Sequence, residues 1–538
     1  MADADSVQRA DPTWEWVVLL ALPVGYLVSA LVLRANMGPF WTWHAIDPSY
    51  FYLLDSANLV NLTTPGHVAH PGTPVQVLGA LVLWVMHGFA GADATIRAVI
   101  ADPEVHLRAI GTVILGLNAL ALAAAGGAAR LAFGGVLPAL MVQSGPFVSR
   151  VIIHNGLYVK PESLLIFAAL ALAAVTLWAL RDDRLAGHKR GFAIAFGVVA
   201  GFAMATKVSA APLFVLPVFL LWGVRPLATY AGVAAVSFVV FTLPAAGAYD
   251  QFFSWMGRVA TGSGHFGEGP QTVIDVARYP RDVIRLFSRP VLFVPLVLSL
   301  VALTFAWHRR SKASARQQVA FRALAGLVLA QILHVLVVAR HPSAHYLVPS
   351  LVLSGLAMAL LYRVVAGMGI GSARLRRHAW QTVIAVFSVF LIAQAVAVAR
   401  QDLELHHWRT EAMSIDNARF RQCARVYFQF ASDPVYALFL GNFITRQKLT
   451  DRIARRAPAN DFWFDVVSRQ FRDAQGPRDV AEVLVQYPCA FFRGQDRAIM
   501  ESYLRENVPG FAVRDVCSTR DETVLTSGVD CTGELTGR

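Results

Sequence analysis

Apolar segments long enough to cross a lipid bilayer recur along this 538-residue sequence, from Trp14 to Ala399. A transmembrane helix needs about 20 consecutive, mostly apolar residues, and the apolar segments of water-soluble core helices are shorter. The composition agrees, because only 15% of the residues are charged, against about 25% in soluble domains. We therefore expect an all-α polytopic membrane domain over this stretch.

The apolar segments give twelve candidate spans, and an even number would leave both termini on one side of the membrane. The segment 136–150 is short and interrupted at residues 143–146 by Gln, Ser, Gly and Pro. We interpret it as a partial, non-spanning helix, which gives about eleven spans; a split elsewhere, giving thirteen, is the alternative. The candidate spans are 14–33, 75–91, 106–132, 136–150, 162–180, 191–206, 208–222, 227–248, 290–307, 319–339, 346–362 and 380–399.

The net charge of +12 comes entirely from the membrane part of the chain. From Arg400 onward there are 19 basic and 19 acidic residues, which leaves 28 against 16 before it. The excess gathers in the loops 181–190, 308–316 and 363–377, which the positive-inside rule places in the cytoplasm. This distribution argues against a nucleic-acid partner and indicates membrane lipids as the surroundings.

All four cysteines follow the last apolar segment, and none has the C-x-x-C spacing of a metal site. An even number confined to one segment favours two disulfides in an oxidising compartment. Because shorter loops close at a lower entropic cost, we predict that Cys423 pairs with Cys489 and Cys517 with Cys531. Four free thiols are the alternative.

These signals predict two domains. Residues 1–399 would form a multi-pass transmembrane domain with outer loops at 34–74 and 249–289, and residues 400–538 a soluble extracytoplasmic domain of the α/β or α+β class. The basic loops and the cysteines place this C-terminal domain outside independently of each other. It carries no recognisable catalytic set, so acceptor binding or a lid is its expected role.

The first outer loop contains an uncommon pair of features, Asp47 followed by Pro48 and, later, a His70-Pro71 turn that opens the next apolar segment. Asp47 could cap the helix that Pro48 begins. Asp55 faces another side of any such helix and is interpreted as structural.

The order of these parts resembles the GT-C superfamily of membrane glycosyltransferases, which includes lipid A aminoarabinose transferases and protein O-mannosyltransferases. Those enzymes have an acidic residue in the first outer loop, then a Lys-Pro-Pro or His-Pro-Pro turn, a second acidic motif before a span, and further polar motifs. The resemblance covers about the first 350 residues. The matching positions here are Asp47, His70-Pro71, Ser149-Arg150, Lys160-Pro161-Glu162, Thr206-Lys207 and His345 through Pro349.

The resemblance implies transfer of a sugar from a polyprenyl-phosphate donor to a lipid, glycan or protein acceptor, lipopolysaccharide among them. It implies a bacterial inner-membrane location with the site and the C-terminus facing the periplasm. Asp47 and Glu162 would be catalytic, although Glu162 could instead pair with Lys160 or stabilise a helix N-terminus. Lys207 could also be a snorkelling residue. The expected donor-phosphate ligands are His70, Lys160, Lys207, Arg340 and His345.

A divalent metal is a further expectation from the resemblance. The aminoarabinose transferases place a Glu before the turn, where this chain has Ala69, so His67, His70 and His265 are the candidate nitrogen ligands. A lipid or sugar transporter without transferase activity is the alternative function. A transporter would line a path at mid-membrane depth with its charged residues, whereas most of these lie at one face.

Overall fold

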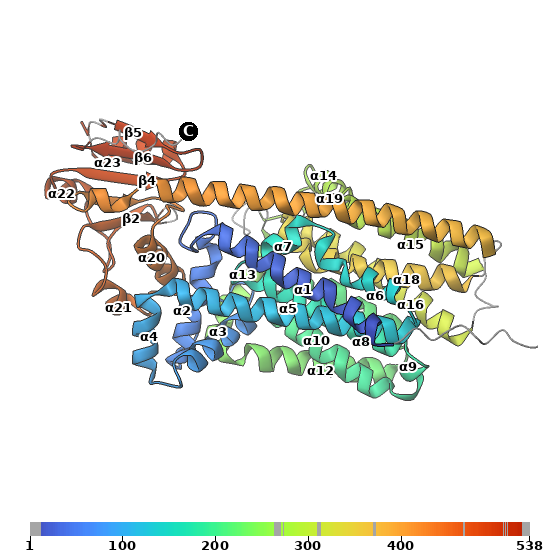
Figure 1. Ribbon diagram of the computed structural model, residues 1–538. Helices are drawn as coiled ribbons and strands as arrows, with labels where there is room; N and C mark the ends of the chain where they lie inside the picture. The colour runs from blue at the N-terminus through green and yellow to red at the C-terminus, as the bar shows by residue number, and fades with distance from the viewer. Residues whose placement is uncertain are drawn as a thin grey trace, which may run out of the picture.

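The computed structural model describes residues 12–529 except 263–270, 273, 309–313, 369–372, 466–467, 509, 512 and 514. Figure 1 shows a bundle of long helices with a small domain containing a β-sheet at one end. We call this the sheet end of the bundle and the opposite end the basic end. The long helix α19 (Ala373–Ser414) runs along the bundle and enters the small domain.

The helices of the bundle follow from long apolar runs bounded by proline, glycine and charged residues. They are α1 (Pro12–Met37), α2 (Ile46–Val60), α3 (Thr73–Met86), α4 (Ala92–Ala101), α5 (Pro103–Phe133), α6 (Val136–Gln143), η1 (Gly145–Phe147), α7 (Arg150–Gly156), α8 (Pro161–Ala179), α9 (Arg184–Gly187), α10 (Lys189–Thr206), η2 (Val208–Val215), α11 (Leu216–Leu220), α12 (Val224–Thr242), η3 (Leu243–Ala248), α13 (Tyr249–Thr261), α14 (Tyr279–Phe287), α15 (Pro290–His308), α16 (Ala315–Val338), η6 (Ala344–Leu347), α17 (Val348–Val352) and α18 (Ser354–Gly367).

Within the described residues, nine helices are long and apolar enough to cross a membrane, and the chain is an integral membrane protein. Two interrupted segments, 136–157 and 208–223, also run from one end of the bundle to the other. The second does so because α10 and α12 run parallel, with Gly197 against Val233 and Gly201 against Ser237. The nine helices and the two interrupted segments cross the bundle eleven times. Because this number is odd, the two ends of the described chain lie at opposite ends of the bundle. The predicted all-α polytopic domain is confirmed, but the segments that cross differ from those expected.

The predicted span 75–91 is wrong. The 14 residues of α3 begin beside the Pro71–Lys207 bridge and do not carry the chain to the basic end. Directly after α3, the ring of His87 lies 2.8 Å, nitrogen to nitrogen, from that of His106 in the first turn of α5. That turn is at the sheet end, where Glu104 accepts the Phe40 amide at 2.8 Å. Both ends of α3 therefore lie at the sheet end.

The interpretation of 136–150 as non-spanning is also wrong. The last turn of α5 lies at the basic end, where Arg130 pairs with Glu15 at the start of α1. Arg34, near the other end of α1, donates to the Leu157 carbonyl. The chain therefore crosses as α6, η1 and α7, and Gln143 donates to the Leu19 carbonyl at 2.8 Å beside the break. A broken helix is tolerated at membrane depth where neighbouring helices bury it.

The loops that carry the excess positive charge lie together at the basic end. Arg316 contacts Asp182 at 3.8 Å and Asp183 at 3.4 Å, which joins the start of α16 to the loop before α9. Gln317 donates to the Gly367 carbonyl at 2.7 Å, which adds the end of α18. The three loops thus share the end opposite the C-terminal domain, as the sequence predicted (Figure 1).

The C-terminal domain contains a six-stranded mixed sheet in the order β3-β2-β1-β4-β6-β5. β1 is parallel to β2 and β4, and the other pairs are antiparallel. Its elements are η7 (Asn417–Phe420), β1 (Ala424–Tyr427), α20 (Pro434–Ile444), α21 (Thr450–Ala454), β2 (Asp461–Asp465), β3 (Gln470–Arg472), α22 (Val480–Val485), β4 (Ala490–Gly494), α23 (Arg497–Asn507), β5 (Asp515–Ser518) and β6 (Thr523–Ser527).

This mixed architecture agrees with the predicted α/β or α+β class. The predicted disulfide between Cys423 and Cys489 is confirmed. In the second predicted pair, Cys531 lies outside the described residues. The predicted boundary between residues 399 and 400 falls inside α19 and stays a prediction.

Candidate active site

Polar residues from five separate segments meet at the sheet end of the bundle. Asp47 is at the start of α2, His70 is in the turn before α3, Lys160 and Glu162 flank the proline that begins α8, Lys207 follows α10, and His345 lies in η6. We call these six residues the polar cluster.

The centre of the polar cluster is an ion pair between Glu162 and Lys207. Their side chains are only 4% and 6% exposed. His345 Nε2 lies 4.0 Å from Glu162 Oε1, and the Lys207 ammonium lies 4.2 Å from the centre of the Tyr346 ring. Glu162 therefore pairs with Lys207, and not with Lys160 as one alternative had it.

A short backbone pairing brings the His70-Pro71 turn to Lys207. Pro71 and Lys207 form an antiparallel β-bridge, and the Val208 amide donates to the His70 carbonyl at 3.1 Å. Gly72 has a φ of +75°, and a Cβ there would lie 2.5 Å from the Tyr52 hydroxyl. Only glycine adopts this backbone readily and leaves room for the tyrosine.

Asp55 fixes the backbone segment that leads into the same turn. Its carboxylate is fully buried and accepts the amides of Gly66 at 2.7 Å and His67 at 2.8 Å. Asn58 and Gln76 donate to it at 3.1 and 3.0 Å. A buried carboxylate with four donors is satisfied, so these contacts support a structural role for Asp55.

Asp47 differs, because it lies at a kink with an extended backbone (φ −98°, ψ 125°), and within the described part of the chain no amide of α2 donates to its carboxylate. The side chain is exposed, although protein atoms surround it on most sides. This partial desolvation raises the pKa of the carboxyl, whereas the charges of Lys160 and Lys207 lower it. The capping alternative finds no support, and an accessible carboxylate with a raised pKa is suited to accept a proton.

Lys160 precedes Pro161 in the sequence, and Glu162 follows it. Burial lowers the pKa of its ammonium, while the charges of Glu162 and Asp47 raise it. Burial also lowers the pKa of His67 to about 4 and that of His70 well below its usual range, so both imidazoles are neutral near pH 7. Such rings can donate one hydrogen bond and accept another.

Two predicted ligands are not part of the cluster as described. The Arg340 guanidinium donates to the carbonyls of Val259 at 3.1 Å and Ala260 at 2.9 Å, and so ties α16 to α13. His265, one of the proposed metal ligands, lies outside the described residues. Across the described ranges, no group of three or more His, Cys, Asp or Glu side chains could hold a metal ion.

Aromatic residues complete the site, and we did not predict their roles from the sequence. The Lys160 ammonium lies 4.7 Å from the centre of the Tyr158 ring, and the His70 and Trp255 rings have centroids 5.1 Å apart. Tyr158 and Tyr346 stand within two residues of a predicted ligand, which is a sequence signal that could have indicated them. Trp255 lies in α13 and had no such signal.

The comparisons with known proteins give one distant structural likeness. No family model and no curated protein matches the sequence. The chain is similar to the crystal structure of ArnT from Cupriavidus metallidurans bound to undecaprenyl phosphate, with 14% identity and a TM-score of 0.47 over 96% of this chain and 98% of that one. The function of the site must be inferred from this chain's own residues and contacts.

Proposed function

We propose that this protein is a membrane glycosyltransferase that moves a sugar from a polyprenyl-phosphate donor to a lipid, glycan or protein acceptor. One observation carries the proposal: the motif residues Asp47, His70, Lys160–Glu162, Lys207 and His345, far apart in sequence, meet at one end of the helix bundle. A one-sided cluster of a carboxylate with cations suits a reaction at a membrane surface.

The proposed step follows from the charges of the cluster. Asp47 takes the proton from an acceptor hydroxyl, whose oxygen forms a bond to the anomeric carbon of the sugar. The bond between that carbon and the phosphate oxygen breaks, and polyprenyl phosphate leaves with the bonding electrons. Lys160 and Lys207 stabilise the negative charge that develops on the phosphate. Glu162 holds Lys207 in place and keeps the buried ammonium compensated.

The placement of these residues favours an enzyme over the transporter alternative. The cluster residues lie at helix ends and in turns: Asp47 in the first residues of α2, His70 before α3, and Lys207 directly after α10. A transport path requires polar groups at several depths of the membrane. We further propose that the sheet end faces the periplasm of a bacterial inner membrane, which agrees with the disulfide and with the basic loops at the opposite end.

Purified protein in nanodiscs, incubated with radiolabelled polyprenyl-phosphate sugars and candidate acceptors, tests the function. Asp47→Asn should fold normally and lose about 10²- to 10⁴-fold in rate, the usual contribution of a general base. Asp93→Asn is the matched control, because Asp93 is an exposed carboxylate that pairs with Arg452 at the same end of the bundle.

Full activity of Asp47→Asn would remove Asp47 from the mechanism. Absence of transfer or donor hydrolysis by the wild-type protein, with every donor supplied, would refute the proposed class of reaction. Movement of intact donor across the bilayer of a proteoliposome would instead support the transporter.

A further inference from the structure

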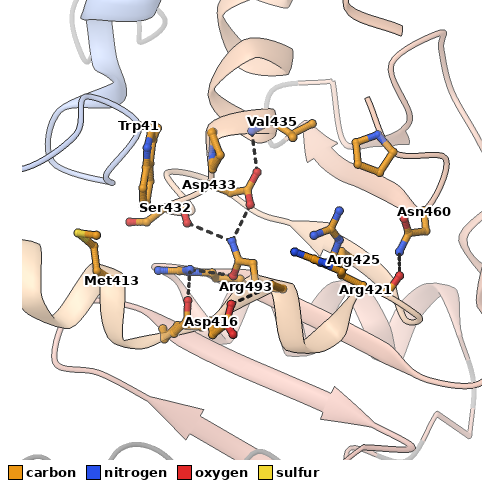
Figure 2. A pocket seen from close by; sticks show the side chains of 15 residues that line it. Trp41, Met413, Asp416, Arg421, Arg425, Ser432, Asp433, Val435, Asn460 and Arg493 are labelled. Atoms are coloured by element: carbon orange, nitrogen blue, oxygen red, sulfur yellow. Dashed lines mark hydrogen bonds between the residues drawn. The ribbon is translucent and has the colours of Figure 1, made fainter. Parts of the chain in front are cut away.

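A pocket of about 680 Å³ lies in the C-terminal domain, where that domain meets the loop between α1 and α2. Its walls come from the end of α19, from η7, β1 and β4, and from the residues that begin α20. Figure 2 shows Trp41 and Met413 on one side and Arg421, Arg425 and Asn460 on the other. Pockets of about 300–1,000 Å³ are typical of small-molecule sites.

Part of the lining is already bound to its neighbours and forms a fixed wall. Arg493 donates to both carboxylate oxygens of Glu522 at 2.9 and 2.7 Å and to Asn417 Oδ1 at 2.9 Å. Asp433 accepts the Val435 amide at 2.7 Å and so caps α20. These groups hold the shape of the pocket and compensate each other's charge.

Other groups in the pocket keep hydrogen-bonding capacity. Arg425 is 8% exposed and pairs with Asp461 through Nη2 at 2.6 Å, but its Nε has no hydrogen-bond partner among the described residues. Within the same described ranges, the exposed guanidinium of Arg421 has no partner either. Asp416 uses one carboxylate oxygen to accept the Ala418 amide at 2.8 Å. Because an unpaired buried donor is costly, the Arg425 Nε indicates a ligand that accepts its hydrogen bond.

The balance of charge argues against a polyanion as that ligand. Arg421, Arg425 and Arg493 are offset by Asp416 and Asp433 in the lining and by Asp461 and Glu522 directly behind it. Polyanion sites, in contrast, carry an excess of basic residues.

A sugar ring fits this combination of groups. Each hydroxyl is both a donor and an acceptor, so it is matched by guanidinium, amide and carboxylate groups side by side. The half-buried indole of Trp41 adds an apolar surface with a polar N–H, a combination favoured at binding interfaces.

We propose that the pocket binds a neutral sugar unit of a glycan acceptor, held by Arg421 and Arg425 against Trp41. As a description of the acceptor this rests on the glycosyltransferase function proposed above. The loop 38–45 connects the two sites, because the Trp43 amide donates to Ser432 Oγ at 2.9 Å. Asp47 follows Trp41 by six residues, so the two Cα atoms are at most about 22 Å apart. One glycan chain can therefore occupy the pocket and present a hydroxyl to Asp47.

The test uses the full-length protein in nanodiscs on an array of immobilised neutral, uronate-bearing and phosphate-bearing oligosaccharides. We expect binding of one or more neutral glycans, weakened about tenfold or more by Arg421→Ala, the loss expected for one hydrogen bond to a charged group. Trp41→Phe should weaken it less than Trp41→Ala. Arg505→Ala is the matched control, because Arg505 is an exposed arginine of the same domain on α23, outside the pocket.

Donor hydrolysis without acceptor, measured on the same variants, separates the two proposals. Unchanged hydrolysis with weakened glycan binding supports the pocket, and glycan binding without any hydrolysis would refute only the transferase. Binding of no glycan, binding confined to uronate- or phosphate-bearing glycans, or equal loss in Arg505→Ala would each overturn the sugar site.

Discussion

The buried pair of Glu162 and Lys207 gives the sharpest prediction of stability and function together. The two side chains are 4% and 6% exposed, so removing either partner leaves an uncompensated charge, at a cost of about 3–5 kcal/mol. The loss of stability in Lys207→Met should be at the lower end of this range, because the positive charge of Lys160 still compensates Glu162. Glu162→Gln should cost more, since it leaves the ammonium groups of Lys160 and Lys207 to repel each other.

The double variant Glu162→Gln/Lys207→Met separates structure from function. Replacing a buried pair by neutral groups of similar volume is often close to neutral in stability, so the double variant should recover most of the loss. It should not recover transfer activity if Lys207 contacts the donor phosphate. Stability is measured as the apparent melting temperature in nanodiscs by tryptophan fluorescence, and activity by the radiolabelled assay.

An exposed pair in the same chain is the control. Arg497 and Glu501 are 2.7 Å apart, with side chains 55% and 37% exposed, and such pairs contribute at most about 1 kcal/mol. If Lys207→Met destabilised the protein no more than Arg497→Ala, the pair would not be buried from water. If the double variant were as unstable as the worse single one, the penalty would not arise from an unpaired charge.

Three further predictions follow from the contacts. Asp55→Asn replaces an acceptor by a donor facing buried N–H groups and should destabilise the protein by about 1–3 kcal/mol; a melting temperature equal to wild type would contradict this. Breaking the Cys423–Cys489 disulfide, which closes a separation of 66 residues, should cost about 4 kcal/mol, and non-reducing peptide mapping should find the two half-peptides linked. In a cysteine-free background, a membrane-impermeant thiol reagent should label cysteines placed at the exposed positions Leu62 and Ala90, before and after α3, from the same side of the membrane; labelling from opposite sides would restore the predicted span 75–91.

Much of the membrane architecture could be predicted from the sequence, because apolar length and loop charge depend on local composition. The basic end was predicted in this way, the mixed C-terminal domain from the chain that follows the last apolar segment, and the first disulfide from the positions of the cysteines. The sequence did not correctly predict which apolar segments cross the membrane. The segment 75–91 is apolar because α3 packs against α2 and α5, whereas 136–157 crosses despite Gly145 and Pro146. Hydropathy reflects the number of apolar residues. It does not show which neighbouring groups form hydrogen bonds to the backbone where a helix is interrupted.

The polar cluster shows the same limit at the level of single side chains. Lys160 and Glu162 are two residues apart, which suggested a local pair, but Lys160 is extended (φ −159°, ψ 168°) while Glu162 already belongs to α8. The two side chains therefore leave the chain in different directions, and the Lys160 ammonium lies over Tyr158. Lys207 reaches Glu162 because the bridge to Pro71 fixes its backbone. The motifs predicted six residues that the fold brings together in the polar cluster, whereas the pairing among them depends on a contact between segments more than 130 residues apart.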